Sequence, residues 1–208
     1  MPHASKRRRR KEARPAEIMA AALTLFSERG FAATRLDDVA ETAGVSKATI
    51  YLYFNSKVEL FKAMVREIAS ARIGAAEALV EGFEGPSPEL IRELIEVLSG
   101  IVALPQIRAI MKVVLAEAGN FPDIAAFYRD EIALRGLKSV SRIIERGVDR
   151  GEFRPCDPVA TAQSVIFPIL MNALAGEIFG AMKEFDAAKF TSSHLDFVLR
   201  GLAADGGA

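Results

Sequence analysis

The stretch "GVSKATIYLYF", residues 44–54, decides how the N-terminal part of the chain folds. Its second half, Ala48 to Phe54, is uncharged and rich in β-branched and aromatic residues, so local propensity alone favours a strand. The flanking residues favour a helix, because Ser46 can cap one helix and "SKVE", residues 56–59, has the capping-box pattern that opens the next. A lone strand between two helix starts would leave its backbone polar groups unpaired, so the stretch is predicted to be a short helix.

Two helices are predicted before it. Pro15 suits a first helical residue, and Gly30 is a C-cap candidate for the first helix. The apolar positions of that helix recur with helical spacing at Ile18, Ala22, Leu25 and Phe26. A second helix is predicted to start at Thr34, through the capping box "TRLD", and to stop at Gly44.

The second and third helices, over "DDVAETAGVSKATIYLYF", match a helix-turn-helix. Gly44 permits the left-handed turn between them. On the third helix Ile50 and Phe54 fall on one side, and the opposite side carries Lys47, Ala48, Tyr51 and Leu52. An exposed face of this composition is unusual for solubility alone and suits the major groove of DNA.

Composition narrows the class of protein. The 208 residues include one cysteine, Cys156, and two histidines, His3 and His194, which gives little support to zinc binding or histidine catalysis and none to an intrachain disulfide. No nucleophile–base pair, metal spacing or cofactor loop is found, so an enzyme is not predicted, and no metal or cofactor is expected. Residues 1–62 carry 12 Lys and Arg against 7 Asp and Glu, whereas the remainder carries 15 against 20. A basic head on an acidic body indicates that the head meets a polyanion.

The rest of the chain also reads as helical, which gives an all-α class with about nine helices and three segments. Residues 1–14 form a basic tail with six consecutive cations at 6–11, expected to be disordered when free. Residues 15–61 form the helix-turn-helix domain, and residues 62–208 form a helical C-terminal domain. Its last helix is predicted to open at Ser192 or Ser193. The most apolar run, 165–182, is short and contains Pro168, so it is not predicted to span a membrane, and a cytoplasmic protein is expected.

The segment "TRLDDVAETAGVSKATIYLYFNSKVELF", Thr34 to Phe61, resembles the DNA-binding region of the TetR family of bacterial one-component transcriptional regulators. The motifs A-G-V-S, I-Y-x-Y-F and S-K-x-x-L carry the resemblance, and Ala48 departs from the Gly that many members have. A further segment, "EAGNFPDIAAFY" at 117–128, resembles one multidrug-regulator-like branch. The resemblance implies a homodimer whose C-terminal domain dimerises and binds a small effector.

The resemblance also implies roles for individual residues. Lys47, Ala48, Thr49 and Leu52 would face base edges, and Tyr51, Tyr53 and Lys57 would hold phosphates. Thr34 would offer its hydroxyl and helix N-terminus to the DNA backbone, and Arg35 and Ser46 complete the predicted DNA-binding set. For Tyr51 and Tyr53 the alternative is a core aromatic with a satisfied hydroxyl.

Two sets of residues are predicted in the C-terminal half. The ligand set is Met64, Met111, Leu115, Phe127, Tyr128, Phe167 and Met171, for which ordinary core packing is an equal alternative. The dimer set combines a small-residue face with apolar partners on the last helix: Ala173, Gly176, Gly180, Leu195, Val198, Leu199 and Leu202.

The sequence thus favours a ligand-responsive repressor that leaves a palindromic operator when it binds a small apolar or aromatic effector. The alternatives are a transcriptional activator or a broad-specificity DNA-binding protein of the same fold.

Overall fold

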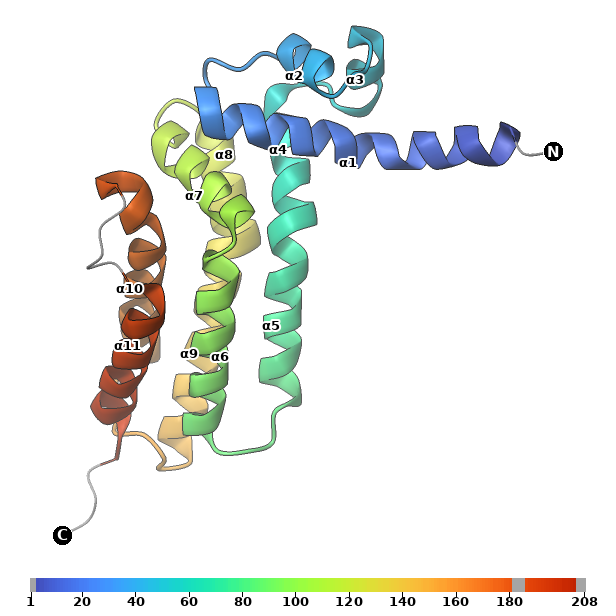
Figure 1. The fold of residues 1–208 in the computed structure, drawn as a ribbon. Helices are drawn as coiled ribbons and strands as arrows, with labels where there is room; N and C mark the ends of the chain where they lie inside the picture. The colour runs from blue at the N-terminus through green and yellow to red at the C-terminus, as the bar shows by residue number, and fades with distance from the viewer. Residues whose placement is uncertain (1–2, 181–185, 205–208) are drawn as a thin grey trace. The chain divides into compact units, whose positions relative to one another are not determined.

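The computed structural model describes residues 3–180 and 186–204, with side chains from Arg14 onward except that of Glu177. Over these ranges the chain is helical, and the only β pairing is an isolated bridge between Phe153 and Ala203 (Figure 1). Two long runs contain a π-helical turn, η1 (Arg66–Ser70) and η2 (Arg129–Ala133). If each run counts as one helix, the described ranges hold nine helices, which confirms the all-α prediction.

The chain divides into two units, Met1–Ala69 with Ala109–Tyr128, and Ser70–Arg108 with Arg129–Ala208. Unit 1 contains α1 (His3–Arg29), α2 (Leu36–Thr42), α3 (Lys47–Tyr53), α4 (Lys57–Val65), most of α7 (Pro105–Glu117) and α8 (Pro122–Tyr128). Its core is made by large side chains from several of these helices and from the α1–α2 loop: Ile18, Phe26, Phe31, Ile50, Phe61, Met64 and Ile124. The predicted C-terminal domain, 62–208, therefore contributes residues 62–69 and 109–128 to the unit that carries the helix-turn-helix.

Two helix starts in unit 1 differ from the prediction. Helix α1 begins at His3 and includes Pro15, whereas residues 1–14 were expected to form a disordered tail. The Lys, Arg, Ala and Glu residues of this segment favour helix, which offsets the cost of one interior proline. The side chains of the six cations lie outside the described residues. Helix α2 begins at Leu36 because Arg35 occupies the cap position, and its N–H donates to Asp38 Oδ2 at 3.0 Å.

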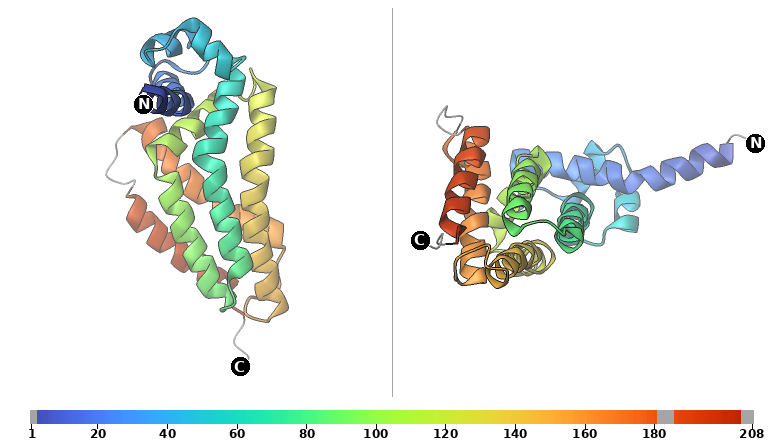
Figure 2. Two further views of the ribbon diagram at one scale, coloured as in Figure 1. Left: turned by 90° about the vertical axis from the view of Figure 1, so that its right-hand side faces the viewer. Right: turned by 90° about the horizontal axis from the view of Figure 1, so that it is seen from below.

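Unit 2 contains α5 (Ala71–Gly82), α6 (Ser87–Val102), α9 (Leu134–Asp149), α10 (Pro158–Phe179) and α11 (Ala187–Leu202). Helix α9 packs against α5, α6 and α10, and α11 packs on α6 and α10 (Figure 2). The core is mainly aliphatic, with one buried aromatic ring, that of Phe153, and it includes Leu90, Leu94, Ile95, Ile143, Ile144, Val165, Ile169 and Leu195. Arg146 fixes the α5–α6 turn, since its guanidinium donates to the carbonyls of Phe83 and Gly85.

Helices α10 and α11 form one antiparallel layer of unit 2. Helix α11 begins at Ala187, earlier than predicted, because the Asp186 carboxylate accepts from the N–H groups of Ala188 and Lys189. By length and composition, the segment Pro158–Gly176 of α10 is apolar enough to cross a membrane, and only 28% of that window is buried. A core helix of a protein outside the membrane passes the same test, so the relevant question is what covers the exposed apolar part of α10.

Candidate DNA-binding interface

The turn between α2 and α3 has the predicted geometry. Gly44 adopts φ +63°, and the N–H of Val45 donates to the Ala40 carbonyl at 2.9 Å. Ile50 is fully buried and Phe54 is nearly so, which anchors α3 to the unit 1 core. The helix-turn-helix is therefore built on the residues that the sequence pattern indicated.

The opposite side of α3 is exposed. We call the four residues Lys47, Ala48, Tyr51 and Leu52 the α3 face. Leu52 is 71% exposed and Tyr51 is 50% exposed, although both are large and mainly apolar. Ser46 caps the helix, because its Oγ accepts from the Thr49 N–H at 3.2 Å. The structure thus brings together on one surface the residues predicted to read DNA.

Two other members of the predicted set are less accessible. Tyr53 is half-buried, with its ring 6.5 Å from that of Phe54. Thr49 is also half-buried, and its hydroxyl lies 2.8 Å from Ser46 Oγ.

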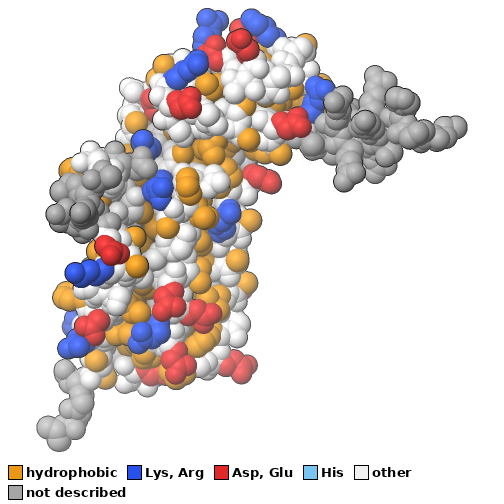
Figure 3. All heavy atoms as spheres, viewed as in Figure 1, with side chains coloured by type: hydrophobic (Ala, Val, Ile, Leu, Met, Phe, Trp, Pro, Cys, Tyr) orange, Lys and Arg blue, Asp and Glu red, His pale blue; other side chains and the backbone are white. Residues whose placement is uncertain are grey.

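The charge beside the α3 face is mixed. Lys47 Nζ lies 2.6 Å from Asp37 Oδ2, and the guanidinium of Arg35 lies 3.9 Å from the same carboxylate oxygen. The Lys47 and Arg35 side chains remain largely exposed in spite of these contacts. Basic and acidic side chains are interspersed over the α2–α3 end (Figure 3). An approaching phosphate would therefore compete with Asp37 for these two cations.

Lys57 has a different environment from the one predicted. Its ammonium donates three hydrogen bonds to backbone carbonyls, at 2.5 Å to Phe31, 2.9 Å to Ala32 and 2.8 Å to Thr34. It also lies 4.5 Å from the centre of the Phe31 ring. Burial lowers the pKa of Lys57, and the nearby Glu117 carboxylate opposes that shift. All three N–H donors are used inside the protein, which corrects the prediction that Lys57 holds a phosphate.

Thr34 requires a similar correction. Its side chain is buried, and its hydroxyl donates to the Gly30 carbonyl at 2.7 Å, so the hydroxyl is not offered to DNA. The sequence pattern missed both roles, because the partners of Thr34 and Lys57 belong to an irregular loop whose path only the folded chain defines.

The predicted ligand residues do not form one set. In unit 1 Met64 and Met111 are buried, and burial raises the pKa of the Tyr128 phenol to about 12. Phe127 is half-buried, with the Arg66 guanidinium 4.8 Å from its ring centre. Leu115 of unit 1, and Phe167 and Met171 of unit 2, are more than half exposed, and Met171 lines an open hollow, so these three residues lie outside the buried part of the predicted ligand set.

The α11 residues of the predicted dimer set lie mainly on the side of that helix that faces the core of unit 2. Leu195, Val198 and Leu202 are buried in the core of unit 2, because α11 packs against α6 and α10 of the same chain. Ala173 and Leu199 are partly buried against that core, whereas Gly176 and Gly180 are exposed. The correction follows from the helical period: a stripe that is apolar enough to dimerise is equally suited to intrachain packing.

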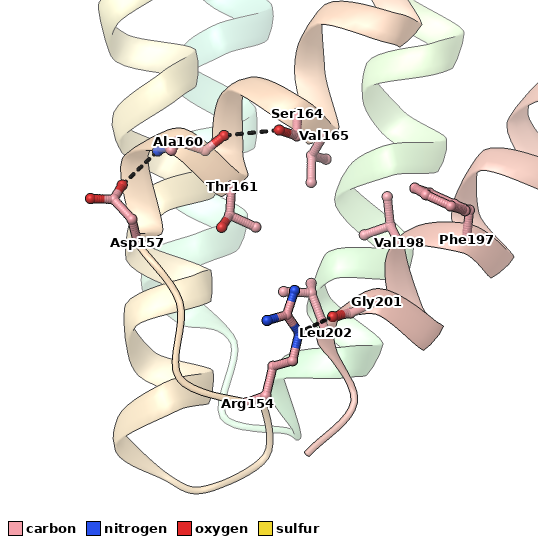
Figure 4. Close-up of a pocket in the computed structure, with 10 residues that line it drawn as sticks. All are labelled: Arg154, Asp157, Ala160, Thr161, Ser164, Val165, Phe197, Val198, Gly201 and Leu202. Carbon is pink, nitrogen blue, oxygen red and sulfur yellow. Dashed lines mark hydrogen bonds between the residues drawn. The ribbon is translucent and has the colours of Figure 1, made fainter. Parts of the chain in front are cut away.

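Large apolar side chains are exposed on the outer side of the same two helices. We call Phe167, Met171 and Phe179 of α10 and Phe197 of α11 the α10–α11 face. Two open hollows lie along it. One, of about 350 Å³, lies between the first turns of α10, with Ala160 and Ser164, and the last turns of α11, with Phe197 and Gly201 (Figure 4). The other, of about 580 Å³, includes Met171, Phe179 and Phe190.

Family comparisons define the class. Residues 18–64 match the model described as bacterial regulatory proteins, tetR family, and residues 89–199 match the AefR-like transcriptional repressor, C-terminal domain. The second match alone covers more than half of the chain. The chain therefore belongs to the TetR family, and it is a DNA-binding transcriptional regulator rather than an enzyme.

Individual relatives agree with this class. The chain is 27% identical over 185 residues to the uncharacterized HTH-type transcriptional regulator YfiR of Bacillus subtilis (strain 168), covering 79% of this chain and 82% of YfiR. It is 42% identical over 78 residues to the HTH-type transcriptional regulator RutR of Escherichia coli (strain K12), covering 38% of this chain and 37% of RutR.

Solved structures share the fold. A SmeT–triclosan complex matches with a TM-score of 0.78 at 21% identity, covering 93% of each chain. A transcriptional regulator from Saccharomonospora viridis in complex with choline matches with a TM-score of 0.76 at 19% identity, covering 92% of this chain and 98% of the other.

Proposed function

We propose that this regulator is a cytoplasmic homodimeric repressor that binds a palindromic operator through the α3 face and is released by a small apolar or aromatic effector. The observation that carries the DNA-binding surface is the exposure of Tyr51 and Leu52 on a helix whose other side is locked into the core. Large side chains with no packing role at such a position fit the major groove.

The DNA contacts divide into two kinds. Lys47, Ala48, Thr49 and Leu52 are proposed to face base edges, where a lysine can donate to guanine and a leucine methyl can contact the thymine methyl. Tyr51, Tyr53, Arg35 and Ser46 are proposed to position the DNA backbone, for which hydroxyl and guanidinium donors are suited. Two copies of α3 would enter successive major grooves about 34–36 Å apart, which requires a palindromic operator.

A second copy of the chain is the proposed cover of the α10–α11 face. Exposed aromatic and thioether side chains are enriched at protein interfaces, and Phe167, Met171 and Phe197 are each more than half exposed in one chain. A dimer formed here would also account for a long apolar helix whose membrane-like segment is only 28% buried in one chain.

The proposed effector contacts are reduced to Phe127, Tyr128, Met64 and Met111 of unit 1. Their aromatic and thioether groups favour an apolar or aromatic ligand, and the triclosan and choline complexes of two structural neighbours support a small molecule as the effector. Leu115, Phe167 and Met171 are not retained, because they are exposed in the single chain.

One observation favours the alternative of broad DNA affinity. Six consecutive cations at residues 6–11 can add phosphate contacts that carry no sequence information. Affinity for a specific site and for random DNA at physiological salt separates the two functions, since a site-specific regulator should show a ratio of roughly 10³ or more.

The direct test is a mobility-shift titration with the DNA upstream of the protein's own gene. We expect Tyr51→Ala to weaken binding broadly, with Leu134→Ala as a control because Leu134 is also 50% exposed but lies in unit 2. Operator binding that survives simultaneous replacement of Lys47, Tyr51 and Tyr53 by Ala would exclude the proposed DNA interface.

A further inference from the structure

The α1–α2 loop, residues 30–35, is held from two sides. From one side Lys57, at the first turn of α4, donates to the carbonyls of Phe31, Ala32 and Thr34. From the other side Glu117, the last residue of α7, accepts the Ala32 N–H at 3.1 Å through Oε1. Glu117 is itself buried, and its other oxygen lies 3.2 Å from Asn120 Nδ2.

An aromatic contact reinforces this arrangement. The ring of Phe121, directly before α8, meets the ring of Phe31 edge-on with centroids 5.1 Å apart. Lys57 Nζ lies 6.0 Å from the Phe121 ring centre and 4.5 Å from that of Phe31. We call Lys57, Glu117 and Phe121 the loop clamp, because together they contact both the backbone and the side chain of Phe31 and the backbone that follows it.

The loop clamp connects the helix-turn-helix to a segment that is joined to unit 2. The loop leads directly into Arg35 and α2, so its position sets the start of the helix-turn-helix. Glu117 and Phe121 belong to the segment 109–128, which is covalently continuous with unit 2 at both ends. A displacement of α7 or α8 that originates in unit 2 therefore reaches the loop through the hydrogen bond between Glu117 and Ala32 and the ring contact between Phe121 and Phe31.

We propose that Glu117 and Phe121 are positioning residues for DNA binding: they hold the α1–α2 loop in its operator-competent position and make that position depend on the α7–α8 turn. The proposal rests on the proposed operator binding. By linkage, a contact that transmits a change from the turn to DNA affinity also transmits operator binding back to the turn, so the coupling is measurable without knowing the effector.

The first experiment compares operator affinity among folded variants by mobility shift. Glu117→Gln keeps an oxygen acceptor for Ala32 and removes the charge beside Lys57, whereas Glu117→Ala removes the acceptor. We expect Glu117→Ala to weaken operator binding about tenfold, the loss that corresponds to one charge-assisted hydrogen bond, and Glu117→Gln to retain most of it. Glu93→Gln, an exposed glutamate on α6, is the charge-matched control.

The second experiment measures hydrogen exchange of wild-type protein with and without operator. We expect DNA to slow amide exchange at 44–54, at 31–35 and also at 117–121. In Phe121→Leu the slowing at 44–54 should persist while that at 117–121 falls. A residue that only stabilises the fold would lower the melting temperature without changing this pattern, so the exchange pattern separates positioning from stability.

The outcomes are distinct. If operator slows exchange at 44–54 but leaves 117–121 unchanged in wild type, or if folded Glu117→Ala binds operator as tightly as wild type, the clamp proposal is overturned and operator binding stands. If wild type itself shows no operator binding, the proposed function fails first.

Discussion

The α3 face and the α10–α11 face both expose large apolar side chains, but their surroundings differ. Leu52 and Tyr51 lie on a seven-residue helix that begins at Lys47, whose ammonium pairs with Asp37. Phe197, which is 76% exposed, lies on a sixteen-residue helix beside an even longer apolar one, and it lines one of the two open hollows. A short, narrow, cation-flanked face fits a DNA groove, whereas a long aromatic face fits another protein surface.

The largest expected effect comes from charged substitutions on the α10–α11 face. Phe167→Asp combined with Phe197→Asp places two charges where a second copy is proposed to pack, which should dissociate the dimer and lower operator affinity by about 100-fold or more, since buried aromatic anchors dominate interfaces. Sedimentation velocity reports the dimer and mobility shift reports the affinity. Leu134→Asp, also exposed but outside this face, should leave both unchanged; a dimer in the double variant would contradict the assignment.

The next effect concerns the α3 face and should leave the dimer intact. Leu52→Ala removes an apolar contact proposed for a base edge, so operator affinity should fall roughly tenfold, within the 1–3 kcal/mol typical of a specific base contact. Affinity for random DNA should change much less. Fluorescence anisotropy with both DNAs checks this, and an equal loss on both would mean that Leu52 makes only a sequence-independent contact with DNA.

The two faces should also differ in how their binding depends on salt, because only the α3 face is proposed to meet the charged DNA. Lys47→Gln removes one cation per subunit close to the DNA. The magnitude of the salt slope of operator binding should therefore fall by up to about 2 for a dimer, because each neutralised phosphate contributes roughly 0.9. Asp37→Asn frees Lys47 from its 2.6 Å partner and should strengthen binding to random DNA a few-fold. Dimer dissociation should show no comparable salt dependence in either variant. Titrations at several salt concentrations provide the measurement, and an unchanged slope in Lys47→Gln would mean that Lys47 makes no phosphate contact.

The smallest effect is confined to unit 2. Hydrogen bonding from Ser87 lowers the pKa of Glu152 below its ordinary value of 4.5, and the Ser87 N–H donates to Glu152 Oε2 at 2.8 Å. A lowered pKa means that the folded state favours the carboxylate, so this stabilisation is present above pH 4.5 and is lost as pH falls through the lower folded value. Glu152→Gln should therefore flatten the acid dependence of unfolding by less than about 1 kcal/mol, measured by urea titration between pH 3 and 6. Glu145→Gln is the exposed control, and an equal flattening in that variant would argue against a specific role for Glu152.

Local patterns predicted much of unit 1. Gly44, Ser46 and the spacing of Ile50 and Phe54 encode the turn and the inward side of α3 within a dozen residues, so the sequence was sufficient there. The cap of α2 was misplaced by one residue, because Thr34 and Arg35 both precede acidic residues at suitable spacing and only burial distinguishes them. Like-charge repulsion at residues 6–11 predicts disorder, but the helix propensity of the Lys, Arg, Ala and Glu residues prevails, so α1 begins at His3.

In the C-terminal half, sequence patterns did not determine which side of a helix faces the core or which residues line a pocket. Helical periodicity identified which residues of α10 and α11 are apolar but not which apolar side faces inward, and Phe197 was absent from the predicted dimer set for that reason. Pocket residues were equally underdetermined, because aromatic and methionine side chains serve core and ligand alike.

The sequence by itself determined the helix-turn-helix, the all-α class and the family, because these depend on caps, turns and spacings that act over a few residues. The tertiary structure decided the role of Lys57, the inward side of α11 and the contact of Glu117 with Ala32. Each of these depends on which residues, distant in sequence, come into contact in the folded chain. The same local pattern of charged or apolar residues is compatible with several different sets of such contacts.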